Sequence, residues 1–148
     1  MPTAESTANA VWEGDLAHGG GRVAPGSGAF EEQEVTWASR TSRSAGKTSP
    51  EELIAAAHAA CYAMAFSNTL TQDGNPPQRL HVVATVSLDR KEGGGVQVTR
   101  SALEVTGEVA GLDQAAFADA ATRAEQACPI SNTIRGNVEV TVSATLRS

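Results

Sequence analysis

The stretch Ser49-Pro-Glu-Glu-Leu-Ile-Ala-Ala-Ala-His-Ala-Ala-Cys-Tyr-Ala-Met-Ala-Phe-Ser-Asn-Thr-Leu-Thr71 decides the fold of this chain. Its first residues predict a helix start: Ser49 is a good N-cap, the proline after it suits the first helical position, and Glu52 completes a capping box. The following residues are rich in alanine and apolar on nearly every face. We therefore expect a long, buried central helix that ends at the turn residues 73–77.

The segments around this helix alternate between apolar and polar residues, as strands with one buried face do. Six strands are predicted, at 10–13, 22–24, 34–38, 79–90, 96–109 and 138–146. A shift of the apolar phase between Val98 and Leu103 predicts a β-bulge. A second helix should start after an N-cap at Asp113 and bury a stripe that ends at Cys128.

This order of elements, with hairpins and segregated helices, predicts an α+β fold in which an antiparallel sheet packs on the central helix. Residues 1–10 have the composition of a flexible tail, and residues 40–48 that of a polar loop. We expect 11–148 to form a single domain. Aromatic residues make up only 4% of the chain, so its core buries little area per side chain and a partner subunit would help to stabilise it.

Composition excludes several classes of function. The net charge is −6 with scattered Lys and Arg, which argues against binding to nucleic acid. No apolar run reaches the roughly 18 residues of a membrane span, so no membrane association is expected. The first residues, MPTAESTANA, lack the features of a signal peptide, and we expect a cytoplasmic protein.

The two cysteines, Cys61 and Cys128, are the candidate reactive residues. A permanent disulfide is not expected in a reducing cytoplasm, and two thiols are too few for the usual zinc site without histidine ligands. Two inert buried thiols or a redox pair remain, and the count alone favours inert thiols. Cys61 lies in mid-helix, whereas Cys128 precedes Pro129 near a helix start, where amides lower a thiol pKa. Spacing alone leaves open which thiol would attack.

Two motifs carry a resemblance to a known family. Thr48-Ser-Pro-Glu-Glu-Leu-Ile-Ala-Ala-Ala-His-Ala-Ala-Cys61 strongly resembles the active-site helix of the osmotically inducible OsmC proteins, relatives of the Ohr organic hydroperoxide resistance proteins. Cys128-Pro-Ile-Ser131 resembles the second cysteine motif of that family. Trp12-Glu-Gly-Asp15 favours OsmC, whereas Arg135-Gly-Asn137 is closer to Ohr. The resemblance extends over residues 11–146.

The resemblance implies a thiol-dependent peroxidase that reduces organic hydroperoxides and, more weakly, hydrogen peroxide. Cys61 would attack the peroxide as a thiolate and become a sulfenic acid, which Cys128 would convert to a disulfide. An external dithiol, such as dihydrolipoamide or a lipoylated protein, would reduce that disulfide. No metal, flavin or haem is implied.

The resemblance also implies that Arg40 stabilises the thiolate and that Glu51 holds Arg40. Arg43 is an alternative for the arginine, because the loop before the helix is about one residue longer than is usual in OsmC proteins. Glu51 and Cys61 are ten positions apart on one helix, about 15 Å along its axis. Two antiparallel copies of the helix would bring Glu51 of one close to Cys61 of the other. We therefore predict a homodimer with composite sites, and the resemblance implies an intertwined one.

Two alternatives remain. His58 precedes Cys61 by one helical turn, an arrangement that would suit a thiol hydrolase or, with Cys128, part of a metal site. A packing or hydrogen-bonding role for His58 is favoured, since the family has a histidine here without using it as the base. The other alternative is a non-catalytic redox-sensing or ligand-binding dimer that uses Cys61 as a switch.

Overall fold

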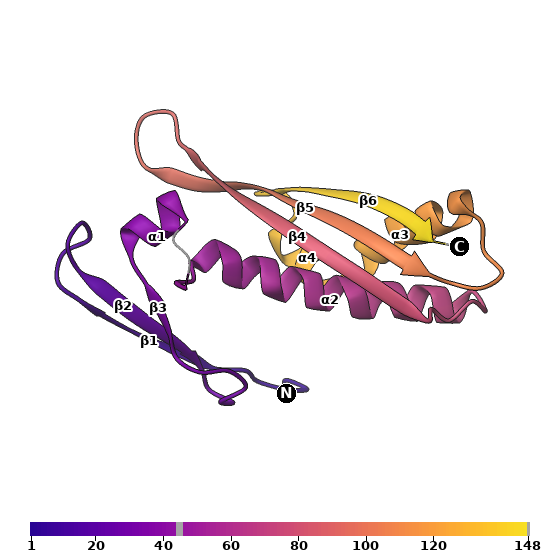
Figure 1. The fold of residues 1–148 in the computed structure, drawn as a ribbon, viewed down its shortest axis with the longest axis horizontal. Helices are drawn as coiled ribbons and strands as arrows, with labels where there is room; N and C mark the ends of the chain where they lie inside the picture. The colour runs from indigo at the N-terminus through magenta and orange to yellow at the C-terminus, as the bar shows by residue number, and fades with distance from the viewer. Residues whose placement is uncertain (44–45, 148) are drawn as a thin grey trace. The chain divides into compact units, whose positions relative to one another are not determined.

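The computed structural model describes residues 1–43 and 46–147. It divides into two compact units, Met1–Leu53 and Ile54–Ser148, each with its own three-stranded sheet (Figure 1). The elements in chain order are β1 (Ala8–Glu13), β2 (Gly20–Pro25), β3 (Gln33–Val35), α1 (Trp37–Ser42), α2 (Pro50–Gln72), β4 (Arg79–Arg90), β5 (Val96–Glu108), α3 (Gln114–Ala127), α4 (Pro129–Ile134) and β6 (Glu139–Arg147). The predicted α+β class is confirmed, and a single domain over 11–148 stays a prediction.

The first unit is built on an antiparallel sheet in the order β1-β2-β3. Its first strand begins at Ala8, where Ala8 pairs with Pro25, so the prediction of a tail over 1–10 is wrong for its last residues. Hydrogen bonding to β2 orders these residues although their side chains are exposed. The tail prediction relied on side-chain composition, which does not report backbone pairing.

A short helix, α1, replaces part of two predicted segments: the strand expected over 34–38 stops at Val35, and α1 extends into the predicted loop 40–48. The Oγ1 atom of Thr36 accepts from the Ser39 amide at 2.9 Å, and the Oγ atom of Ser39 accepts from the Thr36 amide at 3.0 Å. This capping box uses serine in place of the usual Glu or Gln, which is why the sequence pattern did not indicate it. Residues 44 and 45 of the predicted loop lie outside the described residues.

The capping box predicted at the start of α2 is only partly confirmed. Ser49 accepts from the Glu52 amide at 3.0 Å, which confirms it as the N-cap. The Glu52 carboxylate accepts instead from the hydroxyl of Thr48 at 2.8 Å and from Arg43 at 2.7 Å. The reciprocal half of the predicted capping box is therefore replaced by side-chain partners from the preceding loop.

The sheet of the second unit has the order β4-β5-β6. In the antiparallel pair β4–β5 the register shifts so that Ser87 faces Arg100 and Leu88 faces Val98, which confirms the predicted bulge and locates it at Thr99. The pair β5–β6 is parallel, so the expectation of a purely antiparallel sheet is wrong for this pair. The two strands are parallel because α3 and α4 connect them, and a helical crossover joins parallel strands.

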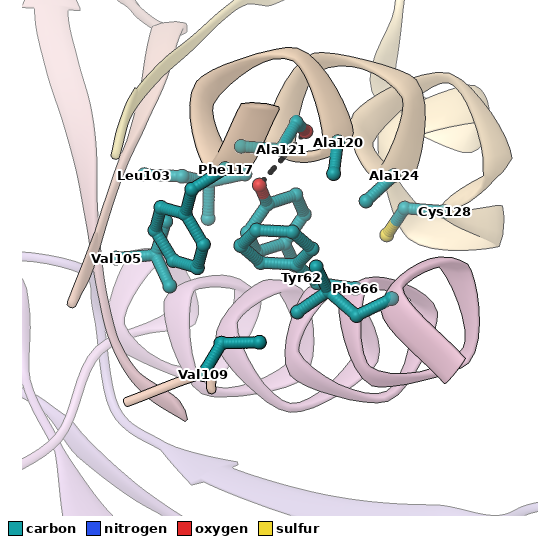
Figure 2. Close-up of a cluster of buried hydrophobic side chains, with 11 residues drawn as sticks. Tyr62, Phe66, Leu103, Val105, Val109, Phe117, Ala120, Ala121, Ala124 and Cys128 are labelled. Carbon is teal, nitrogen blue, oxygen red and sulfur yellow. Dashed lines mark hydrogen bonds between the residues drawn. The ribbon is translucent and has the colours of Figure 1, made fainter. Parts of the chain in front are cut away.

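The core of the second unit lies between α2, α3 and β5. Figure 2 shows its buried side chains, which are Tyr62, Phe66, Leu70, Leu103, Val105, Val109, Phe117, Ala120, Ala121, Ala124 and Cys128. The Tyr62 hydroxyl donates to the carbonyl of Ala121 at 2.9 Å. Gly107 leaves room for the Phe117 ring, since a Cβ atom at that glycine would lie 2.4 Å from it. The predicted stripe along α3, from Phe117 to Cys128, is confirmed as buried.

One face of α2 is left uncovered by the residues that the structure describes. It carries small apolar side chains and a methionine that is 68% exposed, namely Ala56, Ala57, Ala60 and Met64. By length and composition alone α2 could cross a membrane, so the expectation that no segment qualifies is wrong for this helix. Its other face packs on the core through Tyr62, Phe66 and Leu70, as in the core helix of a globular protein.

Candidate active site

The structure brings the two predicted cysteines together in the second unit. Cys61 lies half-buried on α2, and Cys128 is fully buried where α3 meets α4. Both are free thiols, and Cys128 is among the neighbours that raise the pKa of Cys61. Figure 2 shows Cys128 at the margin of the core cluster, with its sulfur turned toward the helix that carries Tyr62 and Phe66. Close approach of two free thiols is the geometry that a reversible disulfide requires.

Local backbone structure places Cys128 between two helices. Its amide donates to the carbonyl of Glu125 at 3.3 Å and so ends α3. Its Sγ atom accepts from the Ser131 amide at 3.5 Å and so caps α4, with Pro129 in the first helical position. Proline cannot supply the amide that would continue α3, so the chain turns at the cysteine. The motif Cys-Pro-Ile-Ser thus forms a helix junction with the thiol inside it.

The surroundings of Cys61 oppose its ionisation. Burial raises the pKa of the Cys61 thiol above its ordinary value, and the neighbouring Cys128 thiol raises it further. A hydrogen bond from the Ile130 amide acts in the opposite direction. These neighbours all belong to the second unit, and none of them carries a positive charge. A reactive thiolate at Cys61 therefore needs a cation beyond these neighbours.

The first unit holds the predicted arginine–glutamate pair. Arg40 donates to Glu51 through Nη2 at 2.7 Å and through Nε at 2.9 Å, with both bonds reaching the same carboxylate oxygen. Glu51 is only 6% exposed, and the guanidinium also lies 5.8 Å from the ring centroid of Trp37. Of the two candidate arginines, Arg40 is the one that Glu51 binds. The α1 helix, missed in the sequence, presents Arg40 to the first turn of α2.

Arg43, the alternative arginine, has a different partner. It closes α1 in a left-handed conformation with φ of 51° and donates to Glu52 at 2.7 Å. Both side chains of this pair are about half exposed, at 48% and 53%. A solvated pair of this kind contributes little to stability.

His58 is completely buried and both of its ring nitrogens are occupied. Nδ1 lies 2.6 Å from the Ser101 hydroxyl, and Nε2 lies 2.7 Å from the Ser131 hydroxyl. Burial lowers the pKa of His58 below its ordinary value, and the charge of Glu125 partly opposes that effect. The predicted hydrogen-bonding role is confirmed. The hydrolase alternative loses its base, since a neutral imidazole shared between two hydroxyls has no free nitrogen for Cys61.

A second buried ion pair was missed in the sequence. Glu125, 6% exposed in the last turn of α3, accepts from Arg135 at 2.8 Å. The same guanidinium donates to the carbonyl of Glu125 at 3.3 Å and to Asn132 Oδ1 at 2.9 Å. The available signal was helical spacing: Glu125 lies three positions before Cys128, on the buried side of α3. Ser101, on β5, had no comparable signal.

Metal binding finds no support at this site. Among the residues that the structure describes, no three histidine, cysteine, aspartate or glutamate side chains are grouped to hold a metal ion. The set of Cys61, His58 and Cys128 is therefore not such a group in the part of the chain that the structure describes.

Known proteins resemble this chain over most of its length. The family model described as OsmC-like protein matches residues 43–143. The chain is 36% identical to Peroxiredoxin OsmC of Escherichia coli (strain K12) over 146 residues, 99% of each chain. It is 35% identical over 101 residues to the Organic hydroperoxide resistance protein of Xanthomonas axonopodis pv. citri (strain 306), 65% of this chain and 66% of that relative.

Among solved structures, the organic hydroperoxide resistance protein OsmC from Legionella pneumophila matches with a TM-score of 0.75 and 24% identity. The match covers 98% of this chain and 99% of that one, which shows a shared fold. The full-length match to an OsmC protein, compared with the partial match to an Ohr protein, agrees with the first cysteine motif and with Trp12-Glu-Gly-Asp15. The chain belongs to the OsmC family.

Proposed function

We propose that this protein is a cysteine-based peroxidase that reduces organic hydroperoxides, with Cys61 as the nucleophile and Cys128 as the resolving thiol. The observation that carries the proposal is the meeting of two free thiols from distant parts of the chain. The peroxidase-type names of the relatives, peroxiredoxin and organic hydroperoxide resistance protein, support the same class of reaction. Free thiols also suit a reducing compartment such as the cytoplasm.

In the first step the Cys61 thiolate attacks the distal oxygen of the hydroperoxide. The O–O bond breaks, Cys61 becomes a sulfenic acid, and the leaving alkoxide takes a proton to give an alcohol. Arg40 is the group that would stabilise the thiolate and the developing negative charge on oxygen. Glu51 fixes the guanidinium by accepting hydrogen bonds from Nε and Nη2 and so orients the remaining N–H groups.

In the second step Cys128 attacks the sulfur of the Cys61 sulfenic acid. The S–S bond forms, the S–O bond breaks, and the hydroxyl leaves with the Cys128 proton as water. A dithiol such as dihydrolipoamide would then reduce the disulfide by two thiol exchanges and become a disulfide itself. The reaction requires no metal or organic cofactor.

A homodimer with composite sites is part of the proposal. The uncovered face of α2, with Ala56, Ala57, Ala60 and Met64, supports it, because small apolar side chains allow two helices to pack closely. Arg40 and Glu51 bind each other within one chain. Each composite site would therefore receive the two residues together, from the subunit that does not supply its cysteines.

The test is steady-state consumption of cumene hydroperoxide, with hydrogen peroxide for comparison, in the presence of dihydrolipoamide. Wild type should turn over many equivalents, Cys61→Ser none, and Cys128→Ser only what direct reduction of the sulfenic acid allows. Full activity of Cys61→Ser would refute the assignment of the nucleophile.

The raised pKa of Cys61 is the observation that favours the redox-sensing alternative, since a protonated thiol reacts slowly with peroxide. Turnover number separates the two functions. A sensor would be oxidised once per subunit and stop, even with excess dithiol.

A further inference from the structure

Arg135 binds both helices that meet at Cys128. Its guanidinium holds the carboxylate and the carbonyl of Glu125 at the end of α3, and it also holds Asn132 in α4. Asn132 donates in turn to the carbonyl of Gln126 at 3.1 Å. We call these residues, Glu125, Asn132 and Arg135, the junction clamp. Cys128 lies in the chain segment that the clamp closes.

The junction clamp should stay formed in the folded protein, because its buried charge is paired. The Glu125 side chain is 8% exposed and also accepts from Gln126 at 2.9 Å, so its charge is paired and its oxygens are satisfied. Loss of Arg135 would leave a buried carboxylate without its charge partner, which is strongly unfavourable. Further hydrogen bonds hold the same junction. The Ser131 hydroxyl binds His58 of α2, and the Ser131 amide donates to the Cys128 sulfur.

We propose that Arg135, acting through Glu125 and Asn132, is a positioning residue for the resolving step. The inference rests on the proposed function. Disulfide formation requires the Cys128 sulfur to approach the Cys61 sulfur within narrow limits of distance and torsion angle. Cys128 is 0% exposed and cannot search for that geometry by free rotation in solvent. The clamp sets the angle between α3 and α4, and thereby the position from which Cys128 attacks.

The position of Cys128 matters because a second hydroperoxide molecule competes with it for the Cys61 sulfenic acid. If Cys128 is slow, another hydroperoxide transfers an oxygen to the Cys61 sulfenic acid, which gives a sulfinic acid and an alcohol. The sulfinic acid cannot be resolved by a thiol. The partition between disulfide and sulfinic acid therefore measures how well Cys128 is placed, independently of the first step.

The test uses Arg135→Gln, Asn132→Ala and a matched control, Arg123→Gln. Arg123 is also an arginine of this helical region, with Asp119 at 3.0 Å and Asp73 at 2.5 Å, but its pairs are exposed and its partners do not belong to the junction clamp. Reduced full-length protein is mixed with cumene hydroperoxide. Loss of the Cys61 thiol and formation of the disulfide are followed by rapid quench and intact mass, without added dithiol.

In Arg135→Gln, Cys61 oxidation should keep its wild-type rate while disulfide formation becomes about tenfold slower, because small displacements of reacting groups are costly in rate. Sulfinic acid should accumulate at peroxide concentrations that leave wild type as disulfide. The control should behave as wild type in both steps. Equal slowing of both steps would indicate a merely structural role and overturn the proposal, as would an unchanged disulfide rate.

Asn132→Ala keeps Glu125 paired and so serves if Arg135→Gln does not fold. It should slow disulfide formation by a smaller factor, and an unchanged rate in a folded Asn132→Ala protein would overturn the proposal. The proposed function fails separately: Cys61 of the wild-type protein would then not be oxidised by the hydroperoxide, whatever the clamp variants do.

Discussion

Glu51 and Glu125 are buried glutamates that each bind an arginine, one in each unit of the molecule. The two pairs match closely: both glutamate side chains are 8% exposed, and the side chains of Arg40 and Arg135 are 32% and 37% exposed. They differ in what they join. Arg40 reaches across the loop between α1 and α2 within the first unit, whereas Arg135 joins α3 to α4 around a cysteine. Under the two proposals, similar ion pairs would stabilise charge in one place and position a thiol in another.

The largest effect should come from Arg40→Gln. With no guanidinium to stabilise the thiolate, kcat/KM for cumene hydroperoxide should fall by about 100-fold, as when one donor to a developing charge is removed. Because burial already raises the pKa of Cys61, loss of the cation raises it further, so the rising limb of the pH–rate profile moves to higher pH. Stopped-flow measurement of Cys61 oxidation across pH checks both points.

Arg43→Gln is the control for that experiment, because Arg43 belongs to the same segment but binds the exposed Glu52. It should retain near wild-type kinetics and pH dependence. If Arg43→Gln shows the large defect and Arg40→Gln does not, the two arginines have been assigned the wrong way round.

For the pair of Arg135 with Glu125, we expect a measurable effect on the free energy of unfolding. Arg135→Gln leaves Glu125 buried without its charge partner, and we expect a loss of about 2–3 kcal/mol, below the range for fully buried pairs because Arg135 is partly exposed. Adding Glu125→Gln in the same chain should recover much of that loss. Urea unfolding of the single and double variants measures the coupling, and strict additivity would show that the pair has no special role.

A smaller effect should come from His58, which lies near Glu125. Its folded-state pKa is lowered by burial, so the unfolded chain binds the proton more tightly and stability falls as pH drops below about 6.5. The dependence approaches at most about 1.4 kcal/mol per pH unit for one proton. His58→Gln should flatten the curve of unfolding free energy against pH between about 6.5 and 5.

The exposed His81 provides the matched control. His81→Gln measures what the loss of an exposed histidine does to the same curve. An unchanged slope in His58→Gln would mean that His58 is protonated as easily in the folded chain as in the unfolded one.

The smallest effects should come from the exposed ion pairs. Arg43→Gln and Arg123→Gln should each lower the free energy of unfolding much less than Arg135→Gln does, because solvated ion pairs contribute little to stability. Thermal unfolding at low and high salt checks this, since a solvated pair is screened. If either variant lost as much unfolding free energy as Arg135→Gln, burial would not explain the difference between the exposed and the buried ion pairs.

Several elements followed from the sequence because their signals are local. The N-cap at Ser49, the alternation along β4 and β6, the bulge and the stripe on α3 each depend on residues a few positions apart. The cysteine motifs and the pair of Arg40 with Glu51 came from the resemblance to OsmC proteins. The capping box of α1 is local as well, but its serine in place of glutamate is a weak signal.

The sequence by itself determined the α+β class, the long α2 helix and the identity of the two candidate thiols, since period, capping and motif are properties of short segments. Only the tertiary structure decided that β6 runs parallel to β5, that His58 lies between Ser101 and Ser131, and that Glu125 and Arg135 form an ion pair. These features depend on which distant segments pack together. That choice is made by burial and pairing over the whole chain, and no short stretch of residues contains it.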